Sequence, residues 1–327
     1  MLNIATMPKI ELHCHLDGSL GPETAQQLLH ESGRDYTLEE LTERMRVPED
    51  CTSLAEYLTR FEIPVSCIQT AQGLKAAAYD LAKRAAAEHI VHLEVRFAPT
   101  LSYSEGLGYT DIIESVEQGL ARARTETGIS TGIIVCAMRH MTREQNMTMF
   151  RAARELYGSG VVAFDLAGDE ASHPIEEFRE LFELARKLAV PFTIHAGETG
   201  RAQNIRGAIE YGAKRIGHGI AMSGDERLMN LCAERRIGIE MCPTSNIQTH
   251  AISDFHRYPL QEFLNHNIAV TVNTDNMTAS NTTSTDELRL VRDTFGLEDE
   301  TMKKLYRNAA EVAFTDDNTK NKLLSLI

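Results

Sequence analysis

The chain has 327 residues, of which 43% are hydrophobic and 24% are charged, and its formal net charge is −14. This acidic balance disfavours a nucleic-acid or anionic-membrane partner, because such surfaces need clustered Lys and Arg. No apolar run approaches the roughly 20 residues of a membrane-spanning helix, and the first residues lack the basic and apolar regions of a secretory signal. The six scattered cysteines predict reduced thiols in a cytoplasmic protein rather than a disulfide framework.

Short β-rich runs alternate with longer helical stretches along the chain. Several of the runs are almost wholly apolar, as strands buried on both faces should be. The predicted strands are 9–12, 91–97, 131–137, 161–167, 190–196, 215–219, 237–242 and 268–274. Between them, stretches such as 72–89 and 174–189 have helical spacing, and Pro174 would stand at a first helical position.

Eight strands that alternate with helices predict an α/β fold, namely a single (β/α)8 TIM-type barrel domain over residues 1–327. An open doubly wound sheet is the structural alternative. A Rossmann fold is disfavoured because no strand runs into a G-x-G-x-x-G loop. The 78 residues between the first two strands, 13–90, would hold several extra helices, and 53–64 among them looks like one amphipathic helix.

Unusual polar residues stand at the C-terminal ends of five predicted strands. In a barrel these ends meet at one rim, where catalytic groups gather. The residues are His13, His15 and Asp17 after the first strand, Gly168, Asp169 and Glu170 after the fourth, His195 and Glu198 after the fifth, His218 in the sixth, and Asp275 and Asn276 after the eighth.

His13 and His15 are two residues apart, so on a strand both imidazoles face the same side. With His195 and Asp275 they form a set of three nitrogens and one oxygen, which suits one Zn²⁺ ion. Other divalent ions that bind imidazole stay open at this point. The sequence contains no H-E-x-x-H, no C-x-x-C, no G-x-S-x-G and no P-loop, so a thiolate zinc site and serine hydrolysis have no support.

Six ordered motifs spread over nearly the whole chain resemble those of the adenosine deaminase family. They are KIELHCHLDGSLGPE (9–23), FDLAGDE (164–170), IHAGE (194–198), RIGHG (215–219), EMCPTSN (240–246) and VNTDN (272–276). The resemblance implies a zinc-dependent (β/α)8 hydrolase that converts a 6-aminopurine to a 6-oxopurine and ammonia. The substrates it implies are the purine nucleosides adenosine and 2′-deoxyadenosine.

The resemblance also implies a role for each motif residue at the metal. His13, His15, His195 and Asp275 match the ligands of one zinc ion per chain. His218 matches the residue beside the attacking water, where it acts as a base or as an electrostatic orienter, and Asp275 would accept a hydrogen bond from that water. Glu198 matches the proton donor to purine N1, and we expect burial to raise its pKa.

On the substrate side, His15 and Asp17 are expected at the nucleoside, with Asp17 at the ribose 5′-hydroxyl. Adenine deaminases of the superfamily usually have Glu at the position of Asp17, and the shorter Asp leaves room for a sugar. The backbone N–H of Gly168 matches the donor to purine N3. Asn276 is a departure, because many family members have an Asp that faces purine N7. An Asn amide donates a hydrogen bond at any pH, so Asn276 is compatible with binding the same edge of the purine, although a preference for a different purine stays open.

Family chemistry leaves the substrate choice open between adenosine, adenine and a modified adenine nucleoside of the aminofutalosine type. AMP is disfavoured because no Lys/Arg cluster or Gly-rich loop lies near the motifs. A binuclear amidohydrolase would need a carboxylated Lys where the fourth strand ends in Leu166-Ala167-Gly168. A non-catalytic barrel would have lost Glu198, His218 or a metal ligand.

In the family, helices like 53–64 form an apolar lid over the sugar. From the sequence, this segment can be either such a lid or an ordinary packed helix, and the oligomeric state is also open.

Overall fold

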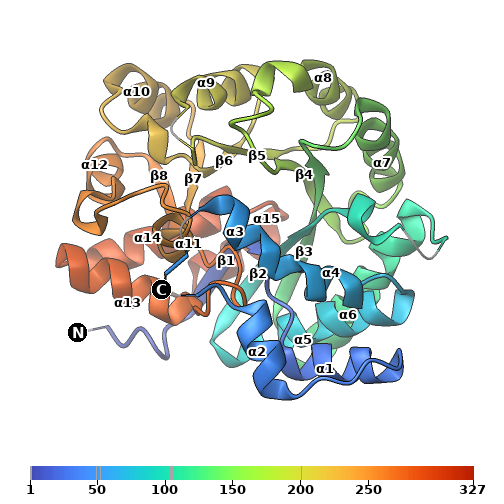
Figure 1. Cartoon of the computed structure of the whole chain (residues 1–327). Helices are drawn as coiled ribbons and strands as arrows, with labels where there is room; N and C mark the ends of the chain where they lie inside the picture. Colours follow the sequence, from blue (N-terminus) through green and yellow to red (C-terminus); the bar gives the residue numbers. More distant parts are fainter. Residues whose placement is uncertain (1, 49, 52, 104–105, 200) are drawn as a thin grey trace.

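In this computed structural model, which describes residues 2–48, 50–51, 53–103, 106–199 and 201–327, helices surround a core of parallel strands (Figure 1). All eight predicted strands are present. They are β1 (Lys9–His15), β2 (Ile90–Phe97), β3 (Ser130–Met138), β4 (Val161–Ala167), β5 (Thr193–Ala196), β6 (Arg215–His218), β7 (Gly238–Met241) and β8 (Ala269–Val272). Strand β1 runs three residues beyond its predicted end and so includes both His13 and His15.

The strands form two parallel four-stranded sheets, β1-β2-β3-β4 and β5-β6-β7-β8. Single parallel bridges join the sheets at both edges, one between Phe164 and Phe192 and one between Cys14 and Asp275. At the second bridge His15 N donates to Asp275 O at 2.7 Å, and Asp275 N donates to His13 O at 2.8 Å. The α/β class and the barrel-like strand order are therefore as predicted, with bridges rather than full ladders between the two sheets in the described part of the chain.

The helices between and after the strands cover the outside of this core. Helices α5 and α6 pack against each other beside β2 and β3, and α7 to α10 follow beside β3 to β7 (Figure 1). The longer helices are α1 (Pro22–Glu31), α2 (Leu38–Met45), α5 (Ala71–Ala87), α6 (Tyr109–Thr127), α7 (Arg143–Glu155), α8 (Arg179–Lys187), α9 (Ala202–Tyr211), α10 (Glu226–Glu234), α13 (Ser284–Phe295), α14 (Asp299–Val312) and α15 (Asp317–Leu324). The shorter ones are α3 (Leu54–Leu58), α4 (Glu62–Cys67), α11 (Pro243–Gln248) and α12 (Leu260–Asn265).

The connection between β1 and β2 holds α1 to α5, which confirms that it contains several helices. The single helix predicted over 53–64 is wrong, because α3 ends at Leu58, a 3₁₀ turn covers Thr59–Phe61, and α4 begins at Glu62. Pro64 explains the break, since a proline has no N–H to donate one turn back and its ring clashes with the carbonyl there.

The predicted helix over 174–189 is also corrected at its start. Residues Ile175–Phe178 form a 3₁₀ turn, and the α-helix α8 begins only at Arg179. Pro174 stands just before this turn rather than at the first position of an α-helix. The N–H of Ile175 donates to the side chain of Asn204 at 3.0 Å, which fixes the turn against α9.

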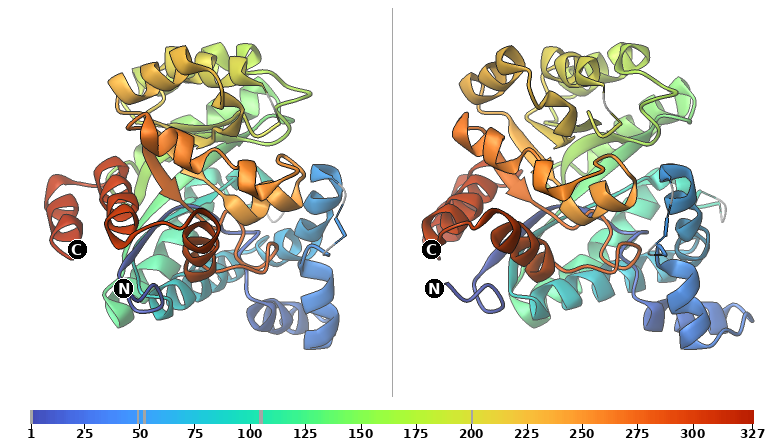
Figure 2. Two further views of the ribbon diagram at one scale, coloured as in Figure 1. Left: turned by 90° about the vertical axis from the view of Figure 1, so that its left-hand side faces the viewer. Right: turned by 60° about the vertical axis from the view of Figure 1, so that its left-hand side comes forward.

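The two ends of the barrel differ. At the N-terminal end of the strands, Phe314 lies over the guanidinium of Arg215 with 3.9 Å between the charge centre and the ring centroid. Helices α14 and α15 pack over Ile10 and Leu12 at the same end. In Figure 2 these C-terminal helices lie on the side away from α1 to α4. The C-terminal ends of the strands therefore form the open rim, beneath the helices of the first connection.

Within the described residues, none of the helices combines the length and the apolar character needed to cross a membrane.

Candidate metal and substrate site

Three imidazoles and a carboxylate meet at the centre of the rim. His15 Nε2 lies 3.2 Å from His195 Nε2 and 3.5 Å from Asp275 Oδ1, and His13 Nε2 lies 3.5 Å from the same carboxylate oxygen. Four ligand atoms about 2.0–2.1 Å from a tetrahedral zinc ion lie about 3.3 Å from one another. The three contacts at 3.2–3.5 Å are compatible with that spacing. The Nε2 atom of His13 is buried and has no hydrogen-bond partner among the described residues, so its lone pair is free to bind a cation.

Backbone geometry brings these donors together. Asp275 follows β8 with a φ of 60°, and its hydrogen bonds to His13 and His15 place its side chain beside both imidazoles. The φ of His218 is 63°, so two polar residues of the rim occupy the left-handed region that costs a non-glycine residue free energy. Gly217 leaves room for His13, because a Cβ at this position would lie 3.0 Å from the His13 ring. Gly217 of the RIGHG motif therefore makes space for the His13 imidazole.

The protonation states of His13, His15 and Asp275 suit a dication. Burial lowers the pKa of His13 to about 4 and lowers the pKa of His15 well below its usual value, so both rings are neutral. Burial alone would raise the pKa of Asp275, but the contacts with His13 and His15 hold it well below its usual value. Burial would lower the pKa of His195, but Asp165 outweighs it and raises that pKa. Neutral imidazoles and an ionised carboxylate are the forms that bind metals.

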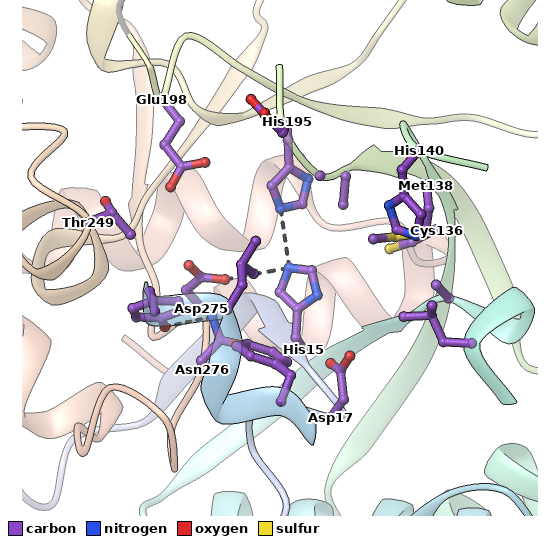
Figure 3. Close-up of a pocket in the computed structure, with 18 of the residues that line it drawn as sticks. His15, Asp17, Cys136, Met138, His140, His195, Glu198, Thr249, Asp275 and Asn276 are labelled. Carbon is purple, nitrogen blue, oxygen red and sulfur yellow. Dashed lines mark hydrogen bonds and ion pairs between the residues drawn. The ribbon is translucent and has the colours of Figure 1, made fainter. Parts of the chain in front are cut away.

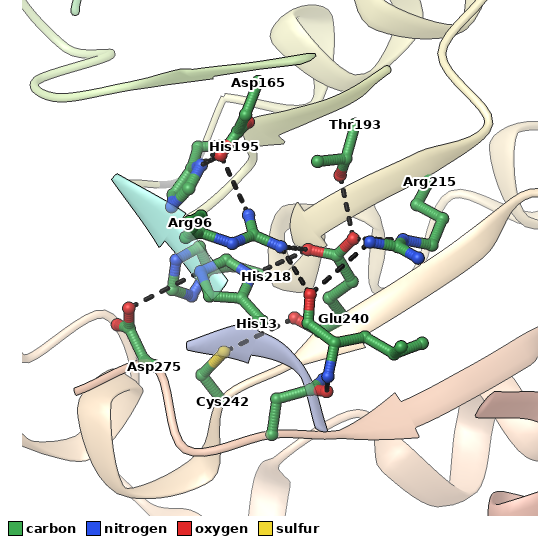
Figure 4. A network of polar contacts seen from close by, with 12 residues as sticks. His13, Arg96, Asp165, Thr193, His195, Arg215, His218, Glu240, Cys242 and Asp275 are labelled. Atoms are coloured by element: carbon green, nitrogen blue, oxygen red, sulfur yellow. Dashed lines mark hydrogen bonds and ion pairs between the residues drawn. The ribbon is translucent and has the colours of Figure 1, made fainter. Parts of the chain in front are cut away.

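Buried carboxylates behind the rim orient two of the imidazoles (Figure 4). Glu240 Oε2 accepts from His13 Nδ1 at 2.7 Å, and Asp165 lies 3.0 Å from His195 Nδ1. Each contact leaves the Nε2 atom facing the centre of the rim. Such outer carboxylates set the tautomer of a ligating histidine and strengthen it as a donor.

Two arginines balance these carboxylates inside the barrel. Arg96 donates to Asp165 at 2.9 Å and to Glu240 at 2.7 Å, and Arg215 donates to Glu240 and Glu94. All five side chains of this network are fully buried. Against the effect of burial, His195 and Arg96 hold the pKa of Asp165 well below its usual value. Arg96 and Arg215 do the same for the pKa of Glu240.

His218 lies on the other side of the cluster, and its Nε2 atom is 3.8 Å from Glu198 Oε2. One donor atom from His218 also lies within 4.8 Å of donor atoms from His13, His195 and Asp275. A choice between His15 and His218 as the third imidazole ligand therefore depends on which nitrogen of His218 has a free lone pair.

Asn246 and Tyr258 decide this question. The Tyr258 hydroxyl donates to Asn246 Oδ1 at 3.0 Å, so the Asn246 amide nitrogen faces His218 Nδ1, at 3.1 Å. His218 Nδ1 must then accept this hydrogen bond, and the hydrogen of the neutral ring sits on Nε2. All three side chains are at most 2% exposed. His218 therefore presents an N–H to the cluster, whereas His15 presents a lone pair.

A cavity of about 460 Å³ opens beside the cluster, within the range of small-molecule sites. Figure 3 shows His15, His195 and Asp275 at its base, with Glu198 on one side and His140 and Met138 on the other. The part of the wall contributed by the first connection and the β2 end is apolar and includes Leu58, Phe61, Val65, Ala98 and Leu101. The segment predicted as a lid or as packing thus lines this cavity.

All of the predicted substrate residues line the same cavity. Asp17 is 8% exposed, and burial raises its pKa to about 6. Gly168 has a φ of 103°, and in the described part of the chain its N–H has no hydrogen-bond partner. Asn276 is 3% exposed, and its Nδ2 atom donates to the Tyr57 hydroxyl at 2.9 Å.

Glu198 has the environment that the sequence predicted. Its side chain is 13% exposed. Burial raises its pKa, and the nearby His218 offsets this only in part. The loop that carries it is held by Glu170, which accepts from Gly197 N at 2.9 Å, Thr199 N at 2.7 Å and Asn204 Nδ2 at 2.8 Å. Glu170 thus anchors the loop that carries Glu198.

Several residues of the site were not predicted. They are Arg96, Asp165, Arg215 and Glu240 in the buried network, Asn246 and Tyr258 behind His218, and Ser245, which donates to Asp275 Oδ2 at 2.7 Å. The available signal was a charged residue inside an apolar strand, as in VHLEVRF or IGIEMC. Such a charge predicts a buried partner, but the sequence does not say which strand supplies it.

The family model described as adenosine deaminase matches residues 8–327. The chain belongs to the adenosine deaminase family. It is 40% identical over 331 residues to the adenosine deaminase of Clostridium perfringens, with 100% of both chains covered. This confirms the resemblance inferred from the six motifs.

Solved structures of the same superfamily show the same fold. The adenine deaminase of Arthrobacter aurescens superposes with a TM-score of 0.89 at 25% identity, with 98% of each chain covered. The N6-methyl-AMP deaminase of Arabidopsis thaliana superposes with a TM-score of 0.86 at 26% identity, with 98% of this chain and 96% of that chain covered. Adenosine deaminase family members thus share the barrel with relatives named for other 6-aminopurines, so the choice of substrate depends on the cavity.

Replacement of Glu240 by Gln should weaken metal binding about 10–100-fold, because His13 loses the carboxylate that orients it. Competition with a chromophoric chelator, using Zn²⁺ as the probe, measures this affinity. The matched control is Glu180→Gln, because Glu180 is a surface residue in an exposed ion pair with Arg143. This control variant should bind Zn²⁺ as tightly as the wild type does. An unchanged affinity in Glu240→Gln would contradict the orienting role.

Proposed function

We propose that this member of the adenosine deaminase family hydrolyses adenosine and 2′-deoxyadenosine to inosine and 2′-deoxyinosine, with release of ammonia, and binds one Zn²⁺ per chain. The observation that carries this proposal is the close approach of His15 to His195 and of His13 and His15 to Asp275, at 3.2–3.5 Å, beside the cavity that the buried carboxyl Glu198 lines. Full-length relatives at about 40% identity are named adenosine deaminase, which supports the same activity.

The donor set supports zinc as the metal, because three imidazoles and one carboxylate at these distances match its preferred ligands. A zinc ion held by these residues would lower the pKa of a bound water and so supply the nucleophile near neutral pH. One ion fits better than two, since no lysine lines the cavity in the described part of the chain. A binuclear site would need such a lysine at the end of β4.

Glu198 is the proposed proton donor to purine N1. Attack at C6 breaks the aromaticity of the ring and moves negative charge onto N1. A carboxyl that is still protonated near neutral pH stabilises this charge by donating its proton. The raised pKa of Glu198 supports that role, because an ionised carboxylate would instead repel the developing charge.

His218 is proposed to orient the attacking water rather than to deprotonate it. Its Nε2 atom carries the hydrogen because Asn246 donates to Nδ1, so the ring donates a hydrogen bond toward the reacting oxygen. Asp275 is the acceptor for a hydrogen of the same water. The Ser245 hydroxyl on Asp275 Oδ2 keeps this carboxylate in place.

The nucleoside contacts follow from the remaining cavity residues. The free N–H of Gly168 is proposed to donate to purine N3, Asn276 to N7, and Asp17 to pair with the ribose 5′-hydroxyl. The apolar side chains of Leu58 and Phe61 would cover the sugar. The short side chain of Asp17 favours a nucleoside over adenine, which is the main alternative within the fold.

We also propose a single domain and a cytoplasmic location. One hydrophobic cluster includes residues from Ile4 to Leu305, which supports a single domain over residues 1–327. All six cysteines are free and buried, which supports a reducing, cytoplasmic compartment.

A substrate panel followed by ultraviolet absorbance tests the function. Adenosine and 2′-deoxyadenosine should be deaminated much faster than adenine, AMP or an adenosine with a bulky 5′ substituent, because only they fill the cavity and pair with Asp17. Metal analysis of the same preparation should find one zinc per chain. Deamination of adenine but not of adenosine would overturn the proposal.

Replacement of Glu198 by Gln should lower kcat by about 10²–10⁴-fold with little change in KM, because a glutamine cannot deliver the proton to N1. Steady-state kinetics with adenosine measure both constants, and the zinc content should equal that of the wild type. A kcat within a few-fold of the wild type would rule out Glu198 as the proton donor.

A further inference from the structure

The hydroxyl of Tyr57 links helix α3 to the segment that follows β8. It accepts a hydrogen bond from Asn276 Nδ2 at 2.9 Å and lies 2.7 Å from Ser280 Oγ. Tyr57, Asn276 and Ser280 are 2%, 3% and 2% exposed. The Tyr57 oxygen therefore accepts from Asn276, and the Tyr57 hydroxyl shares a second hydrogen bond with Ser280 in which either hydroxyl can be the donor.

The other end of the Asn276 amide lies against Gly18. Its Oδ1 atom is buried and has no hydrogen-bond partner among the described residues, and a Cβ at Gly18 would collide with it. A carbonyl oxygen can face a Cα–H as a weak acceptor, whereas an amide NH₂ there would lose its hydrogen bonds. Oδ1 therefore faces Gly18 and Nδ2 faces Tyr57.

This orientation matters because position 276 holds Asn rather than Asp. The two oxygens of a carboxyl are equivalent, but an amide offers a donor at one end and an acceptor at the other. Purine N7 is an acceptor, so an amide turned the wrong way would place oxygen against nitrogen. The Nδ2 atom has two hydrogens, and the contact with Tyr57 uses only one of them.

We propose that Tyr57 is a positioning residue that fixes the Asn276 amide so that its second N–H faces N7 of the bound purine. This inference rests on the proposed function and extends it to the residue that sets base recognition. Tyr57 comes from the same segment as Leu58 and Phe61, which line the cavity. The covering segment therefore also orients the group that recognises the base.

The variant Tyr57→Phe tests this proposal, because it removes the hydroxyl and keeps the ring. Two competitive product inhibitors, inosine and 7-deazainosine, differ only at the N7 acceptor. The wild type should bind inosine more tightly. In Tyr57→Phe this preference should fall about three- to ten-fold, the usual effect of one hydrogen bond, while the Ki of 7-deazainosine stays within two-fold.

Two further variants make the outcome specific. Tyr211→Phe removes a hydroxyl from a tyrosine on α9 that packs against Phe182, and it should keep the wild-type preference. Asn276→Ala should abolish the preference for inosine, and adding Tyr57→Phe to it should change nothing further.

An unchanged preference in Tyr57→Phe would overturn the proposal, as would an equal rise in both Ki values, since this would assign Tyr57 a purely structural role. The proposed function is judged separately, by turnover of adenosine in the wild type. If the wild type deaminates adenosine and Tyr57→Phe still prefers inosine to 7-deazainosine, only the inference about Tyr57 is wrong.

Discussion

The carboxylate of Glu240 is the contact on which the rest of the site depends. From β7 it reaches His13 on β1, Arg96 on β2, Thr193 on β5 and Arg215 on β6. It therefore connects strands of both sheets inside the barrel. Charged groups are costly to take out of water unless every partner is in place. The register of these strands brings all these partners to Glu240 and turns His13 Nε2 toward the rim.

A second buried carboxylate, Glu11, connects β1 to the segment that follows β8. Its two oxygens accept from His13 N and from Thr274 N, each at 3.0 Å, so it clamps β1 to the segment that supplies Asp275. The next residue along, Asn276, hydrogen-bonds to Tyr57 in the first connection. The proposed metal ligand Asp275, the proposed base-recognition residue Asn276 and the covering segment are thus connected by a short stretch of chain after β8.

Sequence motifs predicted the strands and the rim residues well because both depend on local order. Alternation of strands and helices determines the barrel, and residues that follow strands in a barrel meet at one end. Prediction failed where a single local feature changed an element, as at Pro64, which interrupts the helix expected over 53–64. It also missed Glu240 and Arg96 as partners, because they lie 144 residues apart and meet only across the barrel interior.

By itself, the sequence determined the fold class and the family, and it predicted which residues would bind a metal and a purine. Only the tertiary structure decided how those residues are used. Tyr258 and Asn246 set the hydrogen of His218 on Nε2, and Gly18 and Tyr57 turn the Asn276 amide. Histidine and asparagine each have two chemically different ends, and the residue name does not say which end faces the substrate. Packing of distant segments against each side chain makes that choice, since a buried donor or acceptor without its partner is too costly to keep.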